Sequence, residues 1–293
     1  MTTQHTGRPR DRETIALPPG RIVSWNAGPV PLFVRRPPGE IRGVMIAVHG
    51  NTRQATLHAL RFAHLAEAAN LLLIAPLLTR SDYPRFQRLG NNATNDLNTS
   101  LLALLHELEL PLKRWLWFGH SAGAQFVHRY IYQYPGHVQR AVLSAAGWYT
   151  LPDEMVEFPY GLQGLPDRAD LKQVLQVPQR VLVGDHDVLT GDALRRTREL
   201  DLQQGSDRVA RAQTYVEAMR ALARANALPP AVSLRVLKGA GHDFDSNIRS
   251  ARLGVRTLRF LTAGYDQPIA ARRSCTQAHP DTTPDHDEER QDV

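Results

Sequence analysis

A serine between two glycines, in the pentapeptide Gly-His-Ser-Ala-Gly at 119–123, is the feature of this sequence with the clearest chemical potential. The apolar run "WLWF" precedes it and the helix-spaced stretch "AQFVHRYIYQY" follows it, which predicts a tight strand-to-helix turn. Only small side chains fit beside such a turn, because strand and helix approach closely and the central residue is strained. The turn would hold the Ser121 hydroxyl at the carboxyl edge of a sheet and at a helix N-terminus, where free N–H groups favour a developing negative charge.

A serine hydroxyl is a weak nucleophile near neutral pH and needs a neighbouring base. Among the twelve histidines, His242 is the best candidate, because "VSLRVLKGAGHDF" places it in a Gly-rich turn beyond the end of a strand. The base in turn needs an acid that fixes its tautomer. The segment "RVLVGDHDVL" offers Asp185 and Asp187 just after another strand, and Asp185 also suits a capping or turn role.

The chain order of serine, acid and histidine, in this strand-turn-helix setting, resembles the α/β-hydrolase superfamily. In that family the acid commonly stands third after a strand-ending glycine, which favours Asp187 over Asp185. A His-Gly pair after an early strand is a family hallmark, and here it occurs in "HGNTRQ". The resemblance therefore implies an oxyanion hole made by the backbone N–H groups of Asn51 and Ala122.

Within the superfamily, "HGNTRQATLHALRFAHLA", "YPRFQRLG" and "QGSDRVARAQ" resemble the esterase-like and polyhydroxyalkanoate-depolymerase-like branch. The resemblance implies a serine hydrolase that cleaves a carboxylic ester of a small or medium substrate through an acyl-enzyme. Acyl transfer, thioester or amide hydrolysis with the same residues, and a non-catalytic binding protein of the same fold, are the alternatives. A secretion signal and a polymer-binding domain, expected of depolymerases that act on extracellular granules, are not evident, which favours a small-molecule ester over a polymer.

Alternating strand and helix patterns predict the architecture. Apolar runs predict strands at 21–26, 31–36, 43–49, 71–76, 114–119, 140–146, 180–184 and 232–238. Helical spacing predicts helices at about 55–69, 95–109, 122–134, 207–226 and 245–261. Because most strands are apolar on both faces, we expect an α/β-hydrolase fold: a mostly parallel central sheet with helices on both faces, entered by an antiparallel hairpin.

One domain is expected over residues 20–262, while 1–19 and 263–293 are polar, contain proline and are predicted to be disordered. Residues 147–178 interrupt the alternation and predict a short lid insertion, or alternatively a surface excursion that packs its own aromatic side chains. Its residues Trp148, Tyr149 and Phe158 would suit an apolar substrate pocket, although packing within the lid explains them equally well.

The charge pattern narrows the possible partners. The formal charge is +6, but the arginines are spread along the chain without a nucleic-acid-binding motif, so a solvated basic surface is expected rather than nucleic-acid binding. A mild preference for anionic substrates stays open. No cluster has metal-ligand spacing and no Gly-rich dinucleotide motif occurs, so no metal or cofactor is expected.

The location is predicted from cysteine usage and hydropathy. Cys275 is the single cysteine and cannot form an internal disulfide. No apolar run is long enough to span a membrane, and the N-terminal stretch has no hydrophobic core typical of a secretion signal. These features favour a cytoplasmic protein, and the oligomeric state stays open.

Overall fold

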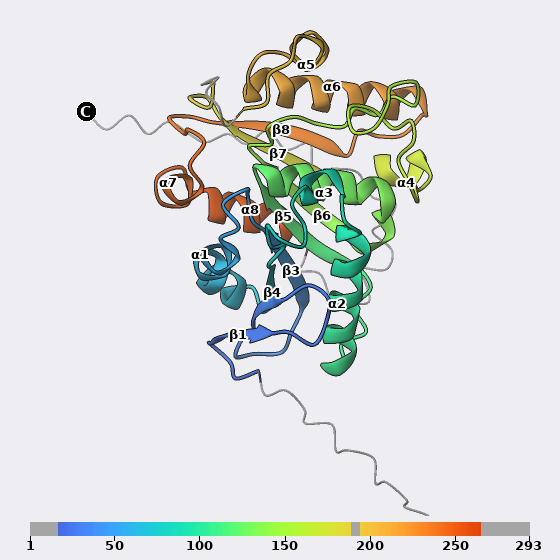
Figure 1. Cartoon of the computed structure of the whole chain (residues 1–293). Helices are drawn as coiled ribbons and strands as arrows, with labels where there is room; N and C mark the ends of the chain where they lie inside the picture. The colour runs from blue at the N-terminus through green and yellow to red at the C-terminus, as the bar shows by residue number, and fades with distance from the viewer. Residues whose placement is uncertain (1–16, 189–193, 265–293) are drawn as a thin grey trace, which may run out of the picture.

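The computed structural model describes residues 17–188 and 194–264. Its centre is an eight-stranded sheet in the order β1-β2-β4-β3-β5-β6-β7-β8 (Figure 1). The strands are β1 (Ile22–Trp25), β2 (Leu32–Arg35), β3 (Gly43–Val48), β4 (Leu71–Pro76), β5 (Trp115–His120), β6 (Val138–Ser144), β7 (Gln179–Gly184) and β8 (Val232–Leu237). Each of them falls within about two residues of a strand predicted from the sequence.

The pairing of the strands agrees with the prediction of a mostly parallel sheet entered by a hairpin. Strand β1 pairs antiparallel with β2, and β2 pairs antiparallel with β4. All pairings from β4 to β8 are parallel. The carboxyl ends of β3, β5, β6, β7 and β8 therefore meet at one edge of the sheet, which is the edge where open α/β sheets bind ligands.

Helices cover both faces of the sheet (Figure 1). Side chains alternate across each strand, so β3 sends Val44 and Ile46 into one core and Met45 into the other. The first core is closed by α2 (Ala93–Glu107), α3 (Ala122–Gln133) and α6 (Arg208–Ala225), and the second by α1 (Ala55–Ala68) and α8 (Leu253–Leu261).

The prediction of a single helix over 245–261 is wrong. Helix α7 (Phe244–Arg249) ends before α8 begins, and Arg252 between them has a left-handed backbone with φ of 53°. The break lets α8 lie tightly on α1, since a Cβ added to Gly254 would lie 2.7 Å from Leu65 Cδ1. Two short helices were not predicted: α4 (Leu171–Leu175) and α5 (Arg198–Gln204), each capped by the side chain that precedes it.

The predicted lid segment, 147–178, contains α4 and an isolated bridge between Glu157 and Gln163, and otherwise consists of turns and loops. The stretches expected to be disordered lie outside the described residues, except for a few positions at their inner ends. One of these, Leu17, is buried in the first core. Within the described part of the chain, no helix combines the length and the apolar character that crossing a membrane requires.

A buried histidine in the second core links stability to pH. His58 on α1 stacks on Phe244 with ring centroids 4.0 Å apart, and its Nδ1–H donates to Gln54 O at 3.1 Å. Burial lowers the pKa of His58 to about 3, because a charged imidazole is poorly solvated there. As the pH falls, His58 is therefore protonated in the unfolded chain before it is protonated in the folded protein. The contribution of neutral His58 to the free energy of unfolding is complete above pH 6.5 and is lost progressively between pH 6.5 and about 3.

We predict that His58→Phe makes the free energy of unfolding less dependent on pH. The phenyl ring can still stack on Phe244 but cannot be protonated in the unfolded chain. At pH 5, proton uptake by unfolded His58 costs the wild-type fold about 2 kcal/mol. Urea unfolding at pH 7 and pH 5 measures how much the free energy of unfolding changes between the two pH values. This change should be smaller for the variant than for the wild type by about this amount. Equal differences for the two proteins would show that His58 is not the titrating group.

Candidate functional site

The turn between β5 and α3 is strained as the pentapeptide predicts. Ser121 joins the two elements with φ of 54° and ψ of −114°, a backbone conformation that residues with a Cβ rarely adopt. A Cβ added to Gly119 would lie 2.3 Å from Gly123 O, and one added to Gly123 would lie 2.3 Å from Val48 O. Both glycines are therefore required by close backbone contacts, one within the turn and one with the end of β3.

Ser121, His242 and Asp187 form a continuous hydrogen-bonded chain. Ser121 Oγ lies 3.1 Å from His242 Nε2, and His242 Nδ1 lies 2.8 Å from Asp187 Oδ2. An ionised carboxylate only accepts hydrogen bonds, so Nδ1 carries the proton and Nε2 is free to accept from the serine hydroxyl. The His242 side chain is 33% exposed, whereas the Asp187 side chain is 1% exposed.

The sheet explains why residues so distant in the sequence meet. Ser121 follows β5, Asp187 follows β7 and His242 follows β8, and these parallel strands end at the same edge. Asp185, the alternative acid, does not contact His242. Its backbone N–H donates to Leu237 O at 3.1 Å, which fastens the turn after β7 to the end of β8.

Arg208 is a site residue that the sequence analysis missed. Its Nη1 donates to Asp187 Oδ1 at 2.9 Å, and both side chains are almost completely buried. Arg208 is the first residue of α6, and the Asp207 side chain caps that helix by accepting from Ala210 N at 2.9 Å. Asp187 is therefore held on both oxygens, one by the imidazole and one by a guanidinium. The cap signal before α6 is readable in the sequence, but the contact with Asp187 is not.

His120 is a second missed residue. Its ring is buried, with Nε2 3.0 Å from the carbonyl oxygen of His242 and Nδ1 3.2 Å from Ser144 Oγ. Burial, together with the nearby His242, places the pKa of His120 well below its usual value. The neutral ring donates from Nε2 to the carbonyl and accepts at Nδ1, and it thereby fixes the backbone of His242.

The His-Gly loop lies next to the serine. A Cβ added to Gly50 would lie 3.5 Å from the Cβ of Ser121. His49 Nδ1–H donates to Gly50 O at 2.8 Å, while Nε2 accepts from Leu78 N at 3.1 Å. Burial lowers the pKa of His49 to about 4, which keeps the ring neutral so that both bonds can form.

The two expected oxyanion donors, the backbone N–H groups of Asn51 and Ala122, belong to the residues that directly follow Gly50 and Ser121. Asn51 is exposed in the turn after the His-Gly pair, and Ala122 is the first residue of α3. The N–H of a first helical residue has no carbonyl partner within its helix. Over residues 17–188 and 194–264, neither of these two N–H groups has a hydrogen-bond partner.

The three aromatic side chains expected in the substrate pocket have different surroundings. Tyr149 is buried and stacks on Tyr215 with centroids 4.4 Å apart, and burial raises its pKa. Trp148 is 3% exposed and lies 4.9 Å from the Tyr160 ring. Phe158 is partly buried against the first core. Tyr149 thus has the surroundings of a core residue, and Trp148 is also buried, between Tyr160 and the guanidinium of Arg129.

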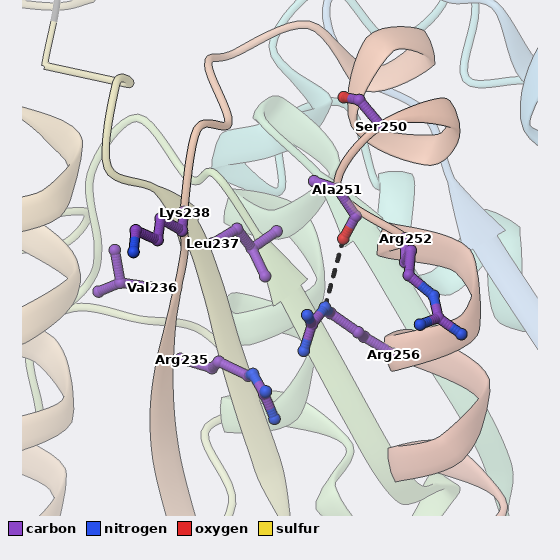
Figure 2. A pocket seen from close by; sticks show the side chains of 8 residues that line it. All are labelled: Arg235, Val236, Leu237, Lys238, Ser250, Ala251, Arg252 and Arg256. Carbon is purple, nitrogen blue, oxygen red and sulfur yellow. Dashed lines mark hydrogen bonds between the residues drawn. The ribbon is translucent and has the colours of Figure 1, made fainter. Parts of the chain in front are cut away.

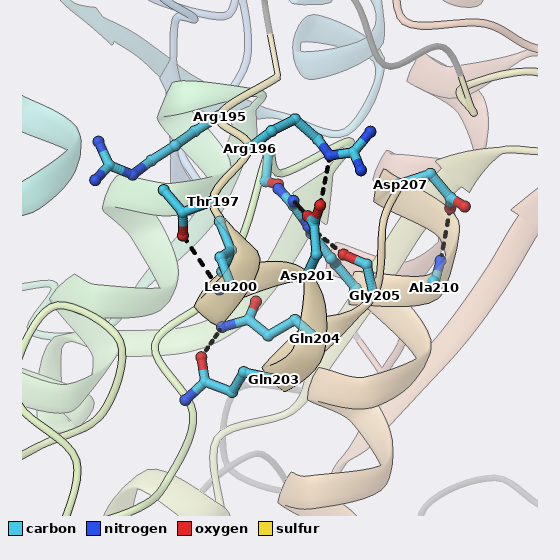
Figure 3. Close-up of polar contacts among 12 residues, drawn as sticks. Arg195, Arg196, Thr197, Leu200, Asp201, Gln203, Gln204, Gly205, Asp207 and Ala210 are labelled. Atoms are coloured by element: carbon cyan, nitrogen blue, oxygen red, sulfur yellow. Dashed lines mark hydrogen bonds and ion pairs between the residues drawn. The ribbon is translucent and has the colours of Figure 1, made fainter.

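The corner between α5 and α6, whose own polar contacts are drawn in Figure 3, also anchors the start of that segment. Gln204 Nε2 donates to Tyr149 O at 2.8 Å, and Gln204 Oε1 accepts from Tyr149 N at 2.9 Å. Arg211 donates to Gly147 O at 2.7 Å and forms an ion pair with Asp201 at 2.7 Å. The first residues of the predicted lid are therefore anchored by buried hydrogen bonds.

A basic surface pocket of about 250 Å³ lies between β8 and the α7–α8 break (Figure 2). Its lining residues include Arg235, Lys238, Arg252 and Arg256, and Arg256 Nε donates to Ala251 O at 3.3 Å. None of the residues of the Ser121–His242–Asp187 chain lines this pocket, so it is separate from the candidate site.

Comparisons with known proteins agree with the geometry. No family model and no curated protein matches the sequence. Poly(aspartic acid) hydrolase-1 from Sphingomonas sp. KT-1 has a similar structure, with a TM-score of 0.70 and 23% identity over 81% of this chain and 99% of that chain. LpqC, a poly(3-hydroxybutyrate) depolymerase from Bordetella parapertussis, matches with a TM-score of 0.66 and 27% identity over 84% and 88% of the two chains. An S-formylglutathione hydrolase from Agrobacterium tumefaciens matches with a TM-score of 0.54 and 13% identity over 82% and 94%.

A mostly parallel eight-stranded sheet with a strained serine turn at its carboxyl edge defines the α/β-hydrolase fold. These similarities confirm the α/β-hydrolase fold predicted from the sequence, and they agree with the predicted resemblance to esterase-like proteins of that fold.

We predict that Arg208→Gln lowers the free energy of unfolding by about 3–5 kcal/mol at pH 7, because it leaves the buried carboxylate of Asp187 without its cation. Adding Asp187→Asn should recover part of this loss, since the buried charge is then gone. Urea unfolding of the wild type, both single variants and the double variant measures the coupling. Strictly additive losses would show that the ion pair does not connect the two side chains energetically.

Proposed function

We propose that the protein is a serine hydrolase that cleaves carboxylic esters of small or medium size through an acyl-enzyme. The observation that carries the proposal is the hydrogen-bonded chain from Ser121 Oγ through His242 to the buried Asp187, starting at a strained backbone position. Each member has the residue type, the exposure and the partner that its role requires.

In the first half of the reaction, Ser121 Oγ attacks the ester carbonyl carbon while His242 Nε2 accepts the hydroxyl proton. The carbonyl oxygen becomes an oxyanion, which the N–H groups of Asn51 and Ala122 stabilise. The intermediate then collapses, the bond to the alcohol oxygen breaks, and His242 returns the proton to the leaving alkoxide. A water molecule repeats the sequence on the acyl-enzyme, with His242 again taking the proton, and releases the acid and free Ser121.

Asp187 supports the histidine in both halves. Its carboxylate keeps the Nδ1 proton in place and stabilises the imidazolium that forms while His242 holds the serine proton. Arg208 fixes the carboxylate by binding the oxygen that His242 does not use. The guanidinium is thus a positioning group, which acts through Asp187.

The ester is favoured as the substrate by the esterase-like resemblance and by LpqC, whose name gives it a polyester substrate. We further propose that residues 147–178 form a lid that sets the size of the substrate, with Trp148 and Phe158 contacting it. The acyl chain would gain roughly 0.8 kcal/mol for each methylene buried against such side chains. The single cysteine favours a cytoplasmic location, as expected from the sequence.

We predict that Ser121→Ala abolishes both hydrolysis of p-nitrophenyl acetate and labelling by a fluorophosphonate probe. The residues of a serine–histidine–aspartate triad act as a unit, so kcat should fall by about 10⁴-fold or more. Circular dichroism should show an unchanged fold. Ser81→Ala, at an exposed serine on the loop after β4, is the control and should keep both properties. A Ser121 variant that retained a tenth of the activity would remove this residue as the nucleophile.

We also predict that Asp187→Asn lowers kcat far more than Asp185→Asn. The first change leaves His242 without a carboxylate partner, whereas the second affects a residue that does not touch the imidazole. Steady-state kinetics with p-nitrophenyl acetate compares the two variants, which carry the same substitution two positions apart. A larger loss of kcat for Asp185→Asn would show that Asp187 is not the acid that supports His242.

A further inference from the structure

Two arginines pack on the Trp148 ring and a third bonds to its neighbour Tyr160. The guanidinium carbon of Arg129 lies 4.3 Å from the centroid of the Trp148 ring, and that of Arg88 lies 5.8 Å from it. The Tyr160 ring packs beside Trp148, and the Tyr160 hydroxyl accepts from Arg195 Nε at 3.1 Å. These five residues are here called the Trp148 cluster.

The positive charge of the Trp148 cluster is not balanced within the described part of the chain. None of its three arginines forms an ion pair with an Asp or Glu of residues 17–188 and 194–264. Arg88 Nε and Arg129 Nη2 are buried and have no hydrogen-bond partner there. Donors of this kind are costly to leave unsatisfied, and a guanidinium without an anion costs more.

The arginines also act on one another. Burial, and after it the charge of Arg88, lowers the pKa of Arg129 to about 9. Burial and then the charge of Arg195 lower the pKa of Arg88. With a pKa of about 9, the Arg129 guanidinium is nevertheless charged at neutral pH, and the charge of Arg88 repels it. A bound anion would remove this repulsion and supply the missing acceptors.

The Trp148 cluster is joined to the catalytic serine through α3. Gln125 N donates to Ser121 O at 3.1 Å, and Gln125 Oε1 lies 3.4 Å from Arg129 Nη1. Arg129 is two helical turns beyond Ser121, or about 12 Å along the helix axis, and helical side chains lean towards the N-terminus of their helix. An ester held at Ser121 would therefore need a linear chain that covers most of this distance to reach the Trp148 cluster.

We propose that the Trp148 cluster binds a carboxylate at the far end of the substrate, so that the preferred esters are anionic. The proposal rests on the proposed function and names the substrate class for it. Guanidinium forks bind carboxylates with two parallel hydrogen bonds, and the partly exposed Tyr160 ring offers an aromatic face to the connecting chain. A neutral ester of the same length could offer a carbonyl oxygen but no negative charge to these arginines.

Arg195 and its neighbour Arg196 provide a matched pair for the test. Arg196 Nε pairs with Asp201 Oδ2 at 2.6 Å, whereas Arg195 points away from this ion pair (Figure 3). Both residues are exposed, so replacing either should leave the fold intact. Only Arg195 belongs to the Trp148 cluster, through its bond to Tyr160.

The experiment compares anionic and neutral esters that have the same length. The first pair is the mono-p-nitrophenyl ester of suberic acid and its methyl ester, which differ in the charge of the acyl end. The second pair is 8-acetoxyoctanoate and its methyl amide, which differ in the charge of the alcohol end. We expect kcat/KM of the wild type to be about tenfold or more higher for the anionic member of at least one pair, as charge-assisted hydrogen bonds are strong. Sodium chloride at high concentration should reduce this ratio.

The variants locate the preference. Arg88→Gln and Arg195→Gln should each bring the anionic-to-neutral ratio close to one, and Arg196→Gln should keep the wild-type ratio. A wild type without preference in either pair would overturn the anion site, as would equal losses for Arg195→Gln and Arg196→Gln. Hydrolysis of the neutral esters that depends on Ser121, but without a preference, overturns this inference alone. A protein that hydrolyses neither ester and does not react with fluorophosphonate overturns the proposed function and the anion site with it.

Discussion

The backbone of Ser121 is the constraint on which the rest of the site depends. At φ of 54° the chain leaves β5 and enters α3 within one residue, and the hydroxyl stays at the carboxyl edge of the sheet. This turn is possible only because Gly119 and Gly123 let backbone atoms meet where a Cβ would collide. The strain is a local cost that the buried contacts of β3, β5 and α3 offset. A strained turn of this kind is therefore found inside a well-packed sheet.

Around the serine, the buried ionisable side chains differ in their partners. Asp187 remains in a buried position because His242 and Arg208 each bind one of its oxygens. His49 and His120, in contrast, are buried without a carboxylate, and burial lowers the pKa of both. As neutral rings they act as both donor and acceptor, and each fixes a backbone segment of the site. Histidine thus has two roles in the site: His242, beside a carboxylate, faces the serine, whereas His49 and His120, without one, hold the backbone.

In the proposed enzyme, different parts of the structure select the substrate and carry out the chemistry. The start of the 147–178 segment is anchored to α5 and α6 by buried hydrogen bonds, and its Trp148 ring packs against Arg129 and Arg88. In the proposed enzyme, changes in that region would alter which ester is accepted while the Ser121–His242–Asp187 chain stays intact. This arrangement is consistent with the general observation that one fold supports many substrates through its loops.

The sequence by itself determined the eight strands, most of the helices and the strained turn, because these depend on local periodicity and on glycine spacing. It also indicated the order of Ser121, Asp187 and His242 along the chain, since strand ends in a parallel sheet meet at one edge. Only the tertiary structure decided that Arg208 and His120 support the Ser121–His242–Asp187 triad, that Tyr149 packs in the core, and that Arg88 and Arg129 lie over one indole. The helix predicted at 245–261 was divided for the same kind of reason, because α8 packs closely on α1. Local patterns carry information about a residue and its neighbours in sequence, whereas these contacts join segments that are brought together only when the sheet is covered on both faces.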